Sequence, residues 1–332
     1  MAEHIGIMIY GEAEEGKLAV ITTELLGCGR KLASDLEQEL SCLLVGSDVS
    51  SLAQEAIAFG ADKVYVVDDP LLKDYQTDSY VLVLEKVVMQ VMPQILLLGQ
   101  SAIGCDLAPR LAFRLGTAVT TDCIELAIDS NSKLLLQTKP VYGGNAQAIF
   151  TCQCYPQMAT VRAKAMSPLE RDDSWHGEVI TVEAGLDPQV IRTKVLEKVV
   201  EEIEGIKLED AKVIVSGGRG IGSAEGFKQL EELANILRGA VGATRPPCDN
   251  GWVSAGSQIG LTGKIVAPDL YIAVALSGAS QHMTGCSSAK NTVAINKDPE
   301  ANIFREAKFG VVGDWRELLP PFTNKVKELL DG

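Results

Sequence analysis

The chain has 332 residues, of which 46% are hydrophobic and 22% charged, so it is long enough for two globular domains. Its net charge of −14 argues against binding to nucleic acid or to an anionic membrane surface. No apolar run reaches the roughly 18–20 residues of a membrane-spanning helix, so no membrane insertion is expected. The first residues enter a strand pattern without a signal peptide, which predicts a cytoplasmic protein.

The cysteines favour reduced thiols over a metal centre. None of the eight forms a CxxC pair, and only three histidines are present to complete a ligand set. Cys152 and Cys154 lie two residues apart in an expected strand and would share one face. We therefore expect small, buried thiols and no metal site.

The first half of the chain alternates short apolar runs with longer helical patterns. The runs, rich in Ile, Val and Leu, predict strands buried on both faces. They lie at 5–10, 41–45, 63–67 and 94–98. Helical spacing follows at 17–36 and 106–116. Such alternation predicts a parallel sheet.

After Thr121 the pattern changes to consecutive strands, which predict an antiparallel extension. They lie at 123–129, 133–144 and 147–155. The stretch 166–210 is a boundary region whose first part is polar and reads as a loop, whereas 190–205 fits a helix or a strand. We expect a first domain at 1–205, with 166–205 as its linker region, and a second at 206–332.

The second half predicts a compact α/β unit. Its strand patterns lie at 212–218, 240–244, 270–276, 292–296 and 309–313. Phe227, Leu230 and Leu233 carry helical spacing after the first of these strands. An amphipathic helix closes the chain, and Pro320 and Pro321 are expected in its first turn.

Polar side chains collect at strand ends and tight turns between 241 and 282, where an open α/β sheet binds its ligand. Arg245 follows one strand, Thr262 and Lys264 lie in a glycine-rich turn, and His282 closes another turn. These groups suit a large, anionic, hydrogen-bonding cofactor. On sequence alone, Arg245 fits a surface ion pair equally well, and an isolated histidine is more often structural than functional.

Two nucleotide motifs fail on spacing. The turn SGGRGIGS at 216–223 has Ser223 where a dinucleotide fingerprint needs its third glycine, and the next strand ends in Arg245 where a NAD site needs an acid. TGK at 262–264 is too short for a P-loop. The chain also shows no nucleophile with a base and no carboxylate pair, so any chemistry is expected to belong to a cofactor.

Five motifs, in this order, closely resemble the alpha subunit of electron-transfer flavoproteins. They are VSGGRG at 215–220, TGKIVAP at 262–268, SGASQH at 277–282, VAINKDPEANIF at 293–304 and FGVVGD at 309–314. YPQMATVR at 155–162 extends the resemblance over essentially the whole chain. It implies an N-terminal parallel-sheet α/β domain with an antiparallel extension and a C-terminal doubly wound FAD-binding domain.

The resemblance implies FAD as the cofactor, with no catalytic residue and no metal ligand. The residues it assigns to FAD are Arg219, Thr244, Arg245, Ile259, Gly260, Leu261, Thr262, Ser277, Gly278, Ala279, Ser280, Gln281, His282, Asn296, Asp314 and Trp315. Arg245 would lie beside the flavin ring, and His282, protonated or donating, near a pyrimidine-ring carbonyl. Asp314 could equally cap a helix. The family usually has glutamine where this chain has Leu261, and the sequence leaves the effect of that exchange open.

By resemblance the chain shuttles electrons as one subunit of a heterodimer. Its N-terminal domain would pack on a beta subunit, and its partners would be acyl-CoA dehydrogenases and a quinone oxidoreductase or ferredoxin. Electron bifurcation, with NADH oxidation, stays open. The alternatives are an NAD(P)-dependent dehydrogenase and a non-catalytic adenine-nucleotide-binding module. We also expect the second domain to rotate on a hinge near Gly205.

Overall fold

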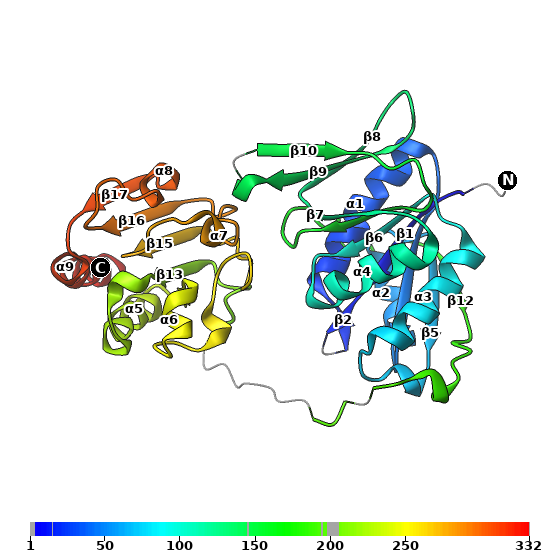
Figure 1. Ribbon diagram of the computed structural model, residues 1–332, viewed down its shortest axis with the longest axis horizontal. Helices are drawn as coiled ribbons and strands as arrows, with labels where there is room; N and C mark the ends of the chain where they lie inside the picture. Colours follow the sequence, from blue (N-terminus) through cyan, green and yellow to red (C-terminus); the bar gives the residue numbers. More distant parts are fainter. Residues whose placement is uncertain (1–3, 15, 145, 194, 198–205, 332) are drawn as a thin grey trace. The chain divides into compact units, whose positions relative to one another are not determined.

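The computed structural model describes residues 4–14, 16–144, 146–193, 195–197 and 206–331 (Figure 1). The chain forms two compact units, Met1–Lys198 and Val199–Gly332, each built on a parallel sheet of its own. The hinge expected at Gly205 lies outside the described residues.

The first unit is built on a seven-stranded sheet in the order β12-β5-β4-β1-β6-β11-β7, in which every neighbouring pair is parallel. The strands are β1 (Ile7–Gly11), β4 (Leu40–Gly46), β5 (Lys63–Asp68), β6 (Ile95–Gly99), β7 (Val119–Cys123), β11 (Gln157–Val161) and β12 (Glu178–Thr181). Every residue of β1, β4, β6 and β11 is buried. This burial explains the uninterrupted apolar runs of β1, β4 and β6. The four predicted strands are confirmed as β1, β4, β5 and β6, of which β5 is only partly buried, whereas β7 and β11 were not predicted.

Helices cover both faces of this sheet. Helices α1 (Val20–Leu36) and α2 (Ala53–Ala58) contribute to the core that contains Ile7 and Ile9 of β1. Helices α3 (Thr77–Val91) and α4 (Ala102–Leu115) contribute to the core that contains the alternate residues Met8 and Tyr10. The Ser101 hydroxyl caps α4 by accepting from the N–H of Gly104 at 2.9 Å.

The expected extension is a separate antiparallel sheet in the order β10-β9-β8. Its strands are β8 (Glu125–Ile128), β9 (Leu135–Val141) and β10 (Ala146–Phe150), and a hairpin of β2 (Ala13–Glu14) and β3 (Lys17–Leu18) lies near the N-terminus. The strand expected at 147–155 was placed too long: β10 ends at Phe150, so Cys152 and Cys154 lie beyond it. Cys154 and Cys105 are exposed rather than buried, although Cys28, Cys42, Cys123 and Cys286 are buried.

The expected linker region contains ordered structure. β12 pairs with β5 at the edge of the first sheet, and the 3-10 helix η4 (Pro188–Val190) follows it. The described residues 191–193 and 195–197 form neither a helix nor a strand. The other 3-10 helices are η1 (Ser50–Leu52), η2 (Pro70–Leu72), η3 (Tyr142–Gly144), η5 (Arg219–Ile221) and η6 (Ala255–Ser257).

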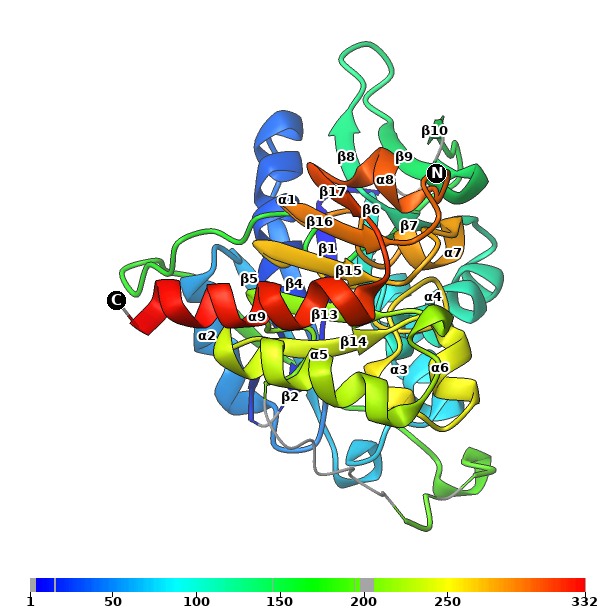
Figure 2. The same ribbon diagram turned by 90° about the vertical axis from the view of Figure 1, so that its left-hand side faces the viewer.

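The second unit is built on a five-stranded parallel sheet in the order β14-β13-β15-β16-β17. The strands are β13 (Val213–Gly217), β14 (Ala240–Ala243), β15 (Leu270–Val274), β16 (Thr292–Asn296) and β17 (Phe309–Val312), and all five were predicted. Helices α5 (Ala224–Ile236) and α9 (Trp315–Asp331) pack side by side on one face (Figure 2). The core of the opposite face contains Ile259, Val266 and Cys286 from connecting segments.

Three short helices complete this unit: α6 (Arg245–Asp249), α7 (Ser280–Met283) and α8 (Ile303–Glu306). The placement of Pro320 and Pro321 in the first turn of α9 was wrong, because the helix begins at Trp315 and holds both prolines inside it. The carbonyls of Arg316 and Glu317, four residues earlier, therefore lose their usual donors. Both residues are exposed, so water can reach these carbonyls.

Candidate cofactor site

The candidate site lies at the carboxyl edge of the second sheet. From β13 the chain goes first to β14 on one side and then to β15 on the other, so the crevice beyond β13 and β15 is a topological switch point. The turn after β13 follows β15 closely, and Gly218 N–H donates to the Val274 carbonyl at 3.0 Å. A Cβ at Gly218 would lie 2.4 Å from the Ala275 oxygen, so only glycine fits there.

A cavity of about 630 Å³ opens at this switch point. Most of the residues that the sequence assigned to a cofactor line it. They are Arg219, Thr244, Arg245, Ile259, Gly260, Leu261, Thr262, Ser277, Ala279, Gln281, His282 and Asn296. Segments separated by up to about eighty residues of sequence thus meet in one place.

Four of the expected residues are not among those that line the cavity. Gly278 (φ +74°) allows its turn to pass the backbone of Ile303, and the Ser280 hydroxyl is exposed. Asp314 accepts from the N–H of Arg316 at 2.9 Å, as the capping alternative predicted. Trp315 is buried and donates through Nε1 to the Gly220 carbonyl at 3.1 Å, so it holds the η5 turn in place.

Arg245 begins α6 directly after β14 and keeps its guanidinium accessible at the cavity. Its Nε lies 3.2 Å from an Asp249 carboxylate oxygen, one helical turn later, and its side chain is 65% exposed. The ion pair that the sequence left open is therefore present. It is too exposed to bind the guanidinium firmly, so Arg245 can turn to an anion in the cavity.

The loop 258–263 supplies hydrogen-bonding groups on another wall. Gln258 Nε2 donates to the Thr262 hydroxyl at 2.9 Å, and both residues line the cavity. Gly260 (φ +144°) is close to α7, because a Cβ there would lie 2.8 Å from the Gln281 oxygen. Leu261 is 61% exposed and donates its N–H to that same oxygen at 2.7 Å. Gln258 thus places beside Thr262 the side-chain amide that Leu261 lacks.

His282 lines the cavity and uses both ring nitrogens within the protein. Its Nδ1 lies 2.9 Å from the Ile259 carbonyl and its Nε2 lies 2.7 Å from the Tyr271 hydroxyl. A carbonyl only accepts, so Nδ1 carries the proton and Nε2 accepts from Tyr271. Burial lowers the pKa of His282 to about 4, so the imidazole is neutral at pH 7. The neutral ring therefore donates through Nδ1 to the Ile259 carbonyl, accepts from Tyr271 through Nε2, and so ties α7 to β15.

Sequence reasoning missed several lining residues. They are Gly218, Gly220, Pro246, Gln258, Ala275, Leu276, Asp298 and Ala301. Six of the eight are glycine, alanine, proline or leucine, residue types that carry no signal for a cofactor. Gln258 and Asp298 are polar and lie near strand ends, so the strand-end rule that selected Asn296 could have found Asp298.

The charges at the cavity oppose those of the whole chain. Arg219, Arg245 and Asp298 are the charged residues among those that line it, so it carries a positive excess in a chain of net charge −14. Such a cavity, with amide and hydroxyl groups and the apolar Ile259 and Leu276, fits an anionic dinucleotide with a planar ring system. β14 ends without a carboxylate to bind a NAD ribose. Among the described residues, no His, Cys, Asp or Glu cluster could hold a metal ion.

The corresponding crevice of the first sheet lies beyond β1 and β6 and is acidic. There Glu12 accepts a hydrogen bond from the Ser101 hydroxyl at 2.7 Å, and burial raises the pKa of Glu12. A cavity of about 360 Å³ beside it is lined by Glu12, Asp48 and Lys73 among others. Its charged lining is thus two carboxyl groups and one lysine, in contrast to the two arginines and one aspartate of the cavity in the second unit.

The second unit therefore defines an α/β cofactor-binding protein with an arginine-bearing cavity at its switch point. Comparison with known families identifies the cofactor. The model of the electron transfer flavoprotein domain matches residues 7–187, and that of the electron transfer flavoprotein FAD-binding domain matches residues 207–287. The chain belongs to the electron transfer flavoprotein alpha-subunit family, and its C-terminal domain is an FAD-binding domain.

Relatives cover the chain from end to end. The electron transfer flavoprotein subunit alpha of Thermoanaerobacterium thermosaccharolyticum is 44% identical, over 99% of this chain and 100% of its own length. That of Megasphaera elsdenii is also 44% identical, over 99% and 98%. The acryloyl-CoA reductase electron transfer subunit beta of Anaerotignum propionicum is 37% identical, over 97% and 95%. Among the described residues, no helix is long and apolar enough to span a bilayer.

Proposed function

We propose that the chain is the FAD-carrying alpha subunit of a heterodimeric electron-transfer flavoprotein that shuttles electrons between acyl-CoA dehydrogenases and other redox partners. The switch-point cavity carries this proposal. It brings together accessible guanidinium groups and hydrogen-bonding groups, and no cluster that could hold a metal ion is found among the described residues. A protein built in this way binds and tunes a redox cofactor instead of transforming a substrate of its own.

FAD, when bound, supplies the electron-accepting and electron-donating chemistry. We propose that Arg219 and Arg245 stabilise its negative charge, because fixed guanidinium groups favour anionic forms. Thr262 and Gln258 present hydroxyl and amide groups from the loop 258–263. The neutral His282 holds α7 against β15 and so keeps the wall of the cavity in place.

The relatives' names support the choice of partners. Two are called subunit alpha, which is consistent with a beta subunit for this chain, and one is the electron transfer subunit of an acryloyl-CoA reductase. We therefore propose a beta subunit as the permanent partner and an acyl-CoA dehydrogenase as a redox partner. A quinone oxidoreductase or a ferredoxin completes the electron path, and NADH joins it if the complex bifurcates electrons.

The test is to co-express both subunits, release and count the flavin, and follow absorbance of the flavin after mixing with a reduced acyl-CoA dehydrogenase. We expect a flavin-containing heterodimer that the dehydrogenase reduces within a catalytic turnover time. A protein that reduces NAD(P) with a substrate of its own, without a second redox protein, would instead be the dehydrogenase of the alternative interpretation.

A further inference from the structure

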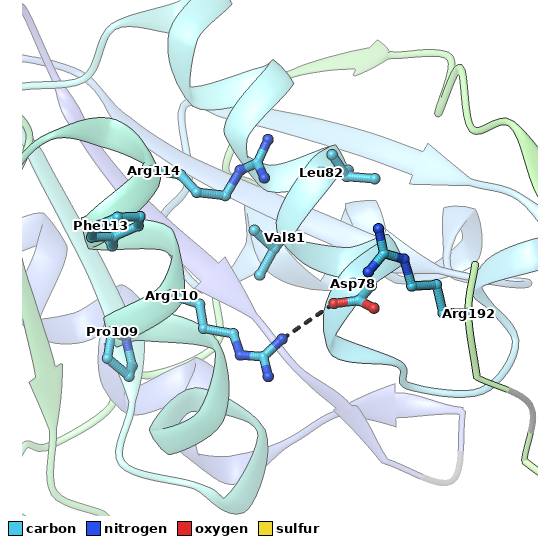
Figure 3. A pocket seen from close by; sticks show the side chains of 8 residues that line it. All are labelled: Asp78, Val81, Leu82, Pro109, Arg110, Phe113, Arg114 and Arg192. Carbon is cyan, nitrogen blue, oxygen red and sulfur yellow. Dashed lines mark hydrogen bonds and ion pairs between the residues drawn. The ribbon is translucent and has the colours of Figure 1, made fainter. Parts of the chain in front are cut away.

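The outer side of the first unit carries an apolar groove of about 670 Å³ between α3 and α4 (Figure 3). Val81 and Leu82 of α3 and Pro109 and Phe113 of α4 form its apolar part. Phe113 is 87% exposed. An aromatic ring left in water on a well-packed helix forgoes a large favourable burial, so such a ring often marks a contact surface.

Three arginines surround these apolar residues. Arg110 lies 3.2 Å from Asp78 (Figure 3). Arg114 lies 2.5 Å from Glu85. Arg192 reaches the groove from the stretch after η4. With Glu85, the partner of Arg114, the groove carries three guanidinium groups against two carboxylates, in a chain of net charge −14.

The composition of the groove is that of an interface. Aromatic residues and arginine are enriched at protein interfaces, whereas lysine is depleted, and the cations that line the groove are all arginines. The Arg110–Asp78 pair is exposed on both sides, at 56% and 43%, whereas Arg114 contacts Glu85, which is 19% exposed, through two nitrogens. An exposed pair such as Arg110–Asp78 adds little to folding, so its guanidinium can be shared with a partner's carboxylate.

We propose that the α3–α4 groove is a docking site for an acidic segment of the beta subunit, with an apolar side chain of that segment seated against Phe113 between the arginines. The inference rests on the proposed heterodimer. The occupant follows from charge complementarity: the groove has a positive excess, so the partner segment supplies carboxylates. Arginines at the rim should raise the association rate and make affinity fall with salt.

The test compares matched variants in the complete, flavin-containing heterodimer. Phe113→Ser removes the exposed ring, and Val20→Ser removes a side chain that is 63% exposed at the start of α1, which packs on the other face of the sheet. Arg110→Glu reverses a charge in the groove. Arg171→Glu reverses a charge in a similar pair elsewhere, since Arg171 is 55% exposed and lies 2.8 Å from Asp173. Circular dichroism and thermal unfolding verify folding.

The dissociation constant of the two subunits is then measured by dilution in mass photometry at low and high salt. We expect Phe113→Ser and Arg110→Glu each to weaken the heterodimer at least about tenfold, as hot-spot residues do, and both controls to stay within about twofold. The effect of Arg110→Glu should shrink at high salt. Groove variants that pair like the wild-type chain would overturn the docking site while leaving the proposed function intact. Normal pairing without bound FAD would instead refute the proposed function alone.

Discussion

Replacing Arg245 by alanine separates the effect of this residue on the cofactor from its effect on the fold. The guanidinium stands at the start of α6, at the edge of the cavity, and makes one ion pair, with Asp249 at 3.2 Å. The side chain is 65% exposed, so its removal should leave the folded domain nearly as stable as before. Any sizeable change must then arise in the cavity.

Two magnitudes decide the expected result. An exposed ion pair one helical turn apart contributes about 0.3–0.5 kcal/mol to folding. A hydrogen bond to a charged group contributes about 1.5–3 kcal/mol, and it favours the more negative, reduced form of the flavin. For a one-electron step, about 1.4 kcal/mol corresponds to about 59 mV. We therefore expect the Arg245→Ala variant to have a midpoint potential lower by roughly 60 mV or more.

The assay is a spectroscopic redox titration of the flavin-containing heterodimer, together with a flavin count. Asp249→Ala is the matched control, because it removes the same ion pair and keeps the guanidinium. We expect the control to retain the wild-type potential or exceed it slightly, and both variants to keep most of their FAD. An Arg245→Ala protein with the wild-type potential would refute the electrostatic role of this residue.

Three further predictions concern buried groups. Tyr271→Phe removes the hydroxyl that donates to Nε2 of His282 and so favours its neutral form. The pKa of His282, followed by NMR titration, should therefore rise from about 4 in this variant. An unchanged pKa would contradict the assigned tautomer. Burial raises the pKa of Glu24 from about 4.5 to about 7. Its stabilising contribution is therefore complete below about pH 4.5 and lost as the pH rises towards 7. Glu24→Gln should accordingly raise the thermal midpoint at pH 8 more than at pH 4.5. Equal shifts at the two pH values would contradict the raised pKa of Glu24. Gly278→Ala places an alanine in a left-handed backbone conformation, which costs about 1–2 kcal/mol of folding free energy. It also brings the new Cβ to 2.3 Å from the Ile303 nitrogen, so both the thermal midpoint and the FAD content should fall. A variant as stable as the wild type would contradict this close approach.

Strands buried on two faces could be predicted where they leave an uninterrupted apolar run, as in β1 and β4. β7 and β11 of the same sheet were not predicted, because both contain polar residues and so lack such a run. β12 was missed for the converse reason. It is a four-residue edge strand with mostly exposed side chains, so its sequence carries no apolar run, and only its pairing with β5 defines it. The position of Pro320 inside α9 was missed because Asp314 begins the helix earlier than the apolar spacing indicates.

The cavity was largely predictable because parallel strands place their carboxyl ends at one edge, so polar residues after β13, β14, β15 and β16 must converge. The direction in which a side chain points was not predictable. Trp315 and His282 both lie in motifs assigned to the cofactor, yet Trp315 turns to the Gly220 carbonyl and His282 to Tyr271. Such choices depend on which buried polar atoms need partners, and these atoms come from distant segments.

Hydrogen–deuterium exchange of the heterodimer, deflavinated and then reloaded with FAD, tests most directly the claim that this chain carries FAD at the switch point of its second sheet. Within this chain we expect FAD to slow exchange at 218–220, 244–245, 258–262 and 275–282, the segments that surround the cavity. Exchange at 45–49, beside the crevice of the first sheet, should stay unchanged. Protection at 45–49 instead, or none in the four cavity segments, would contradict the account.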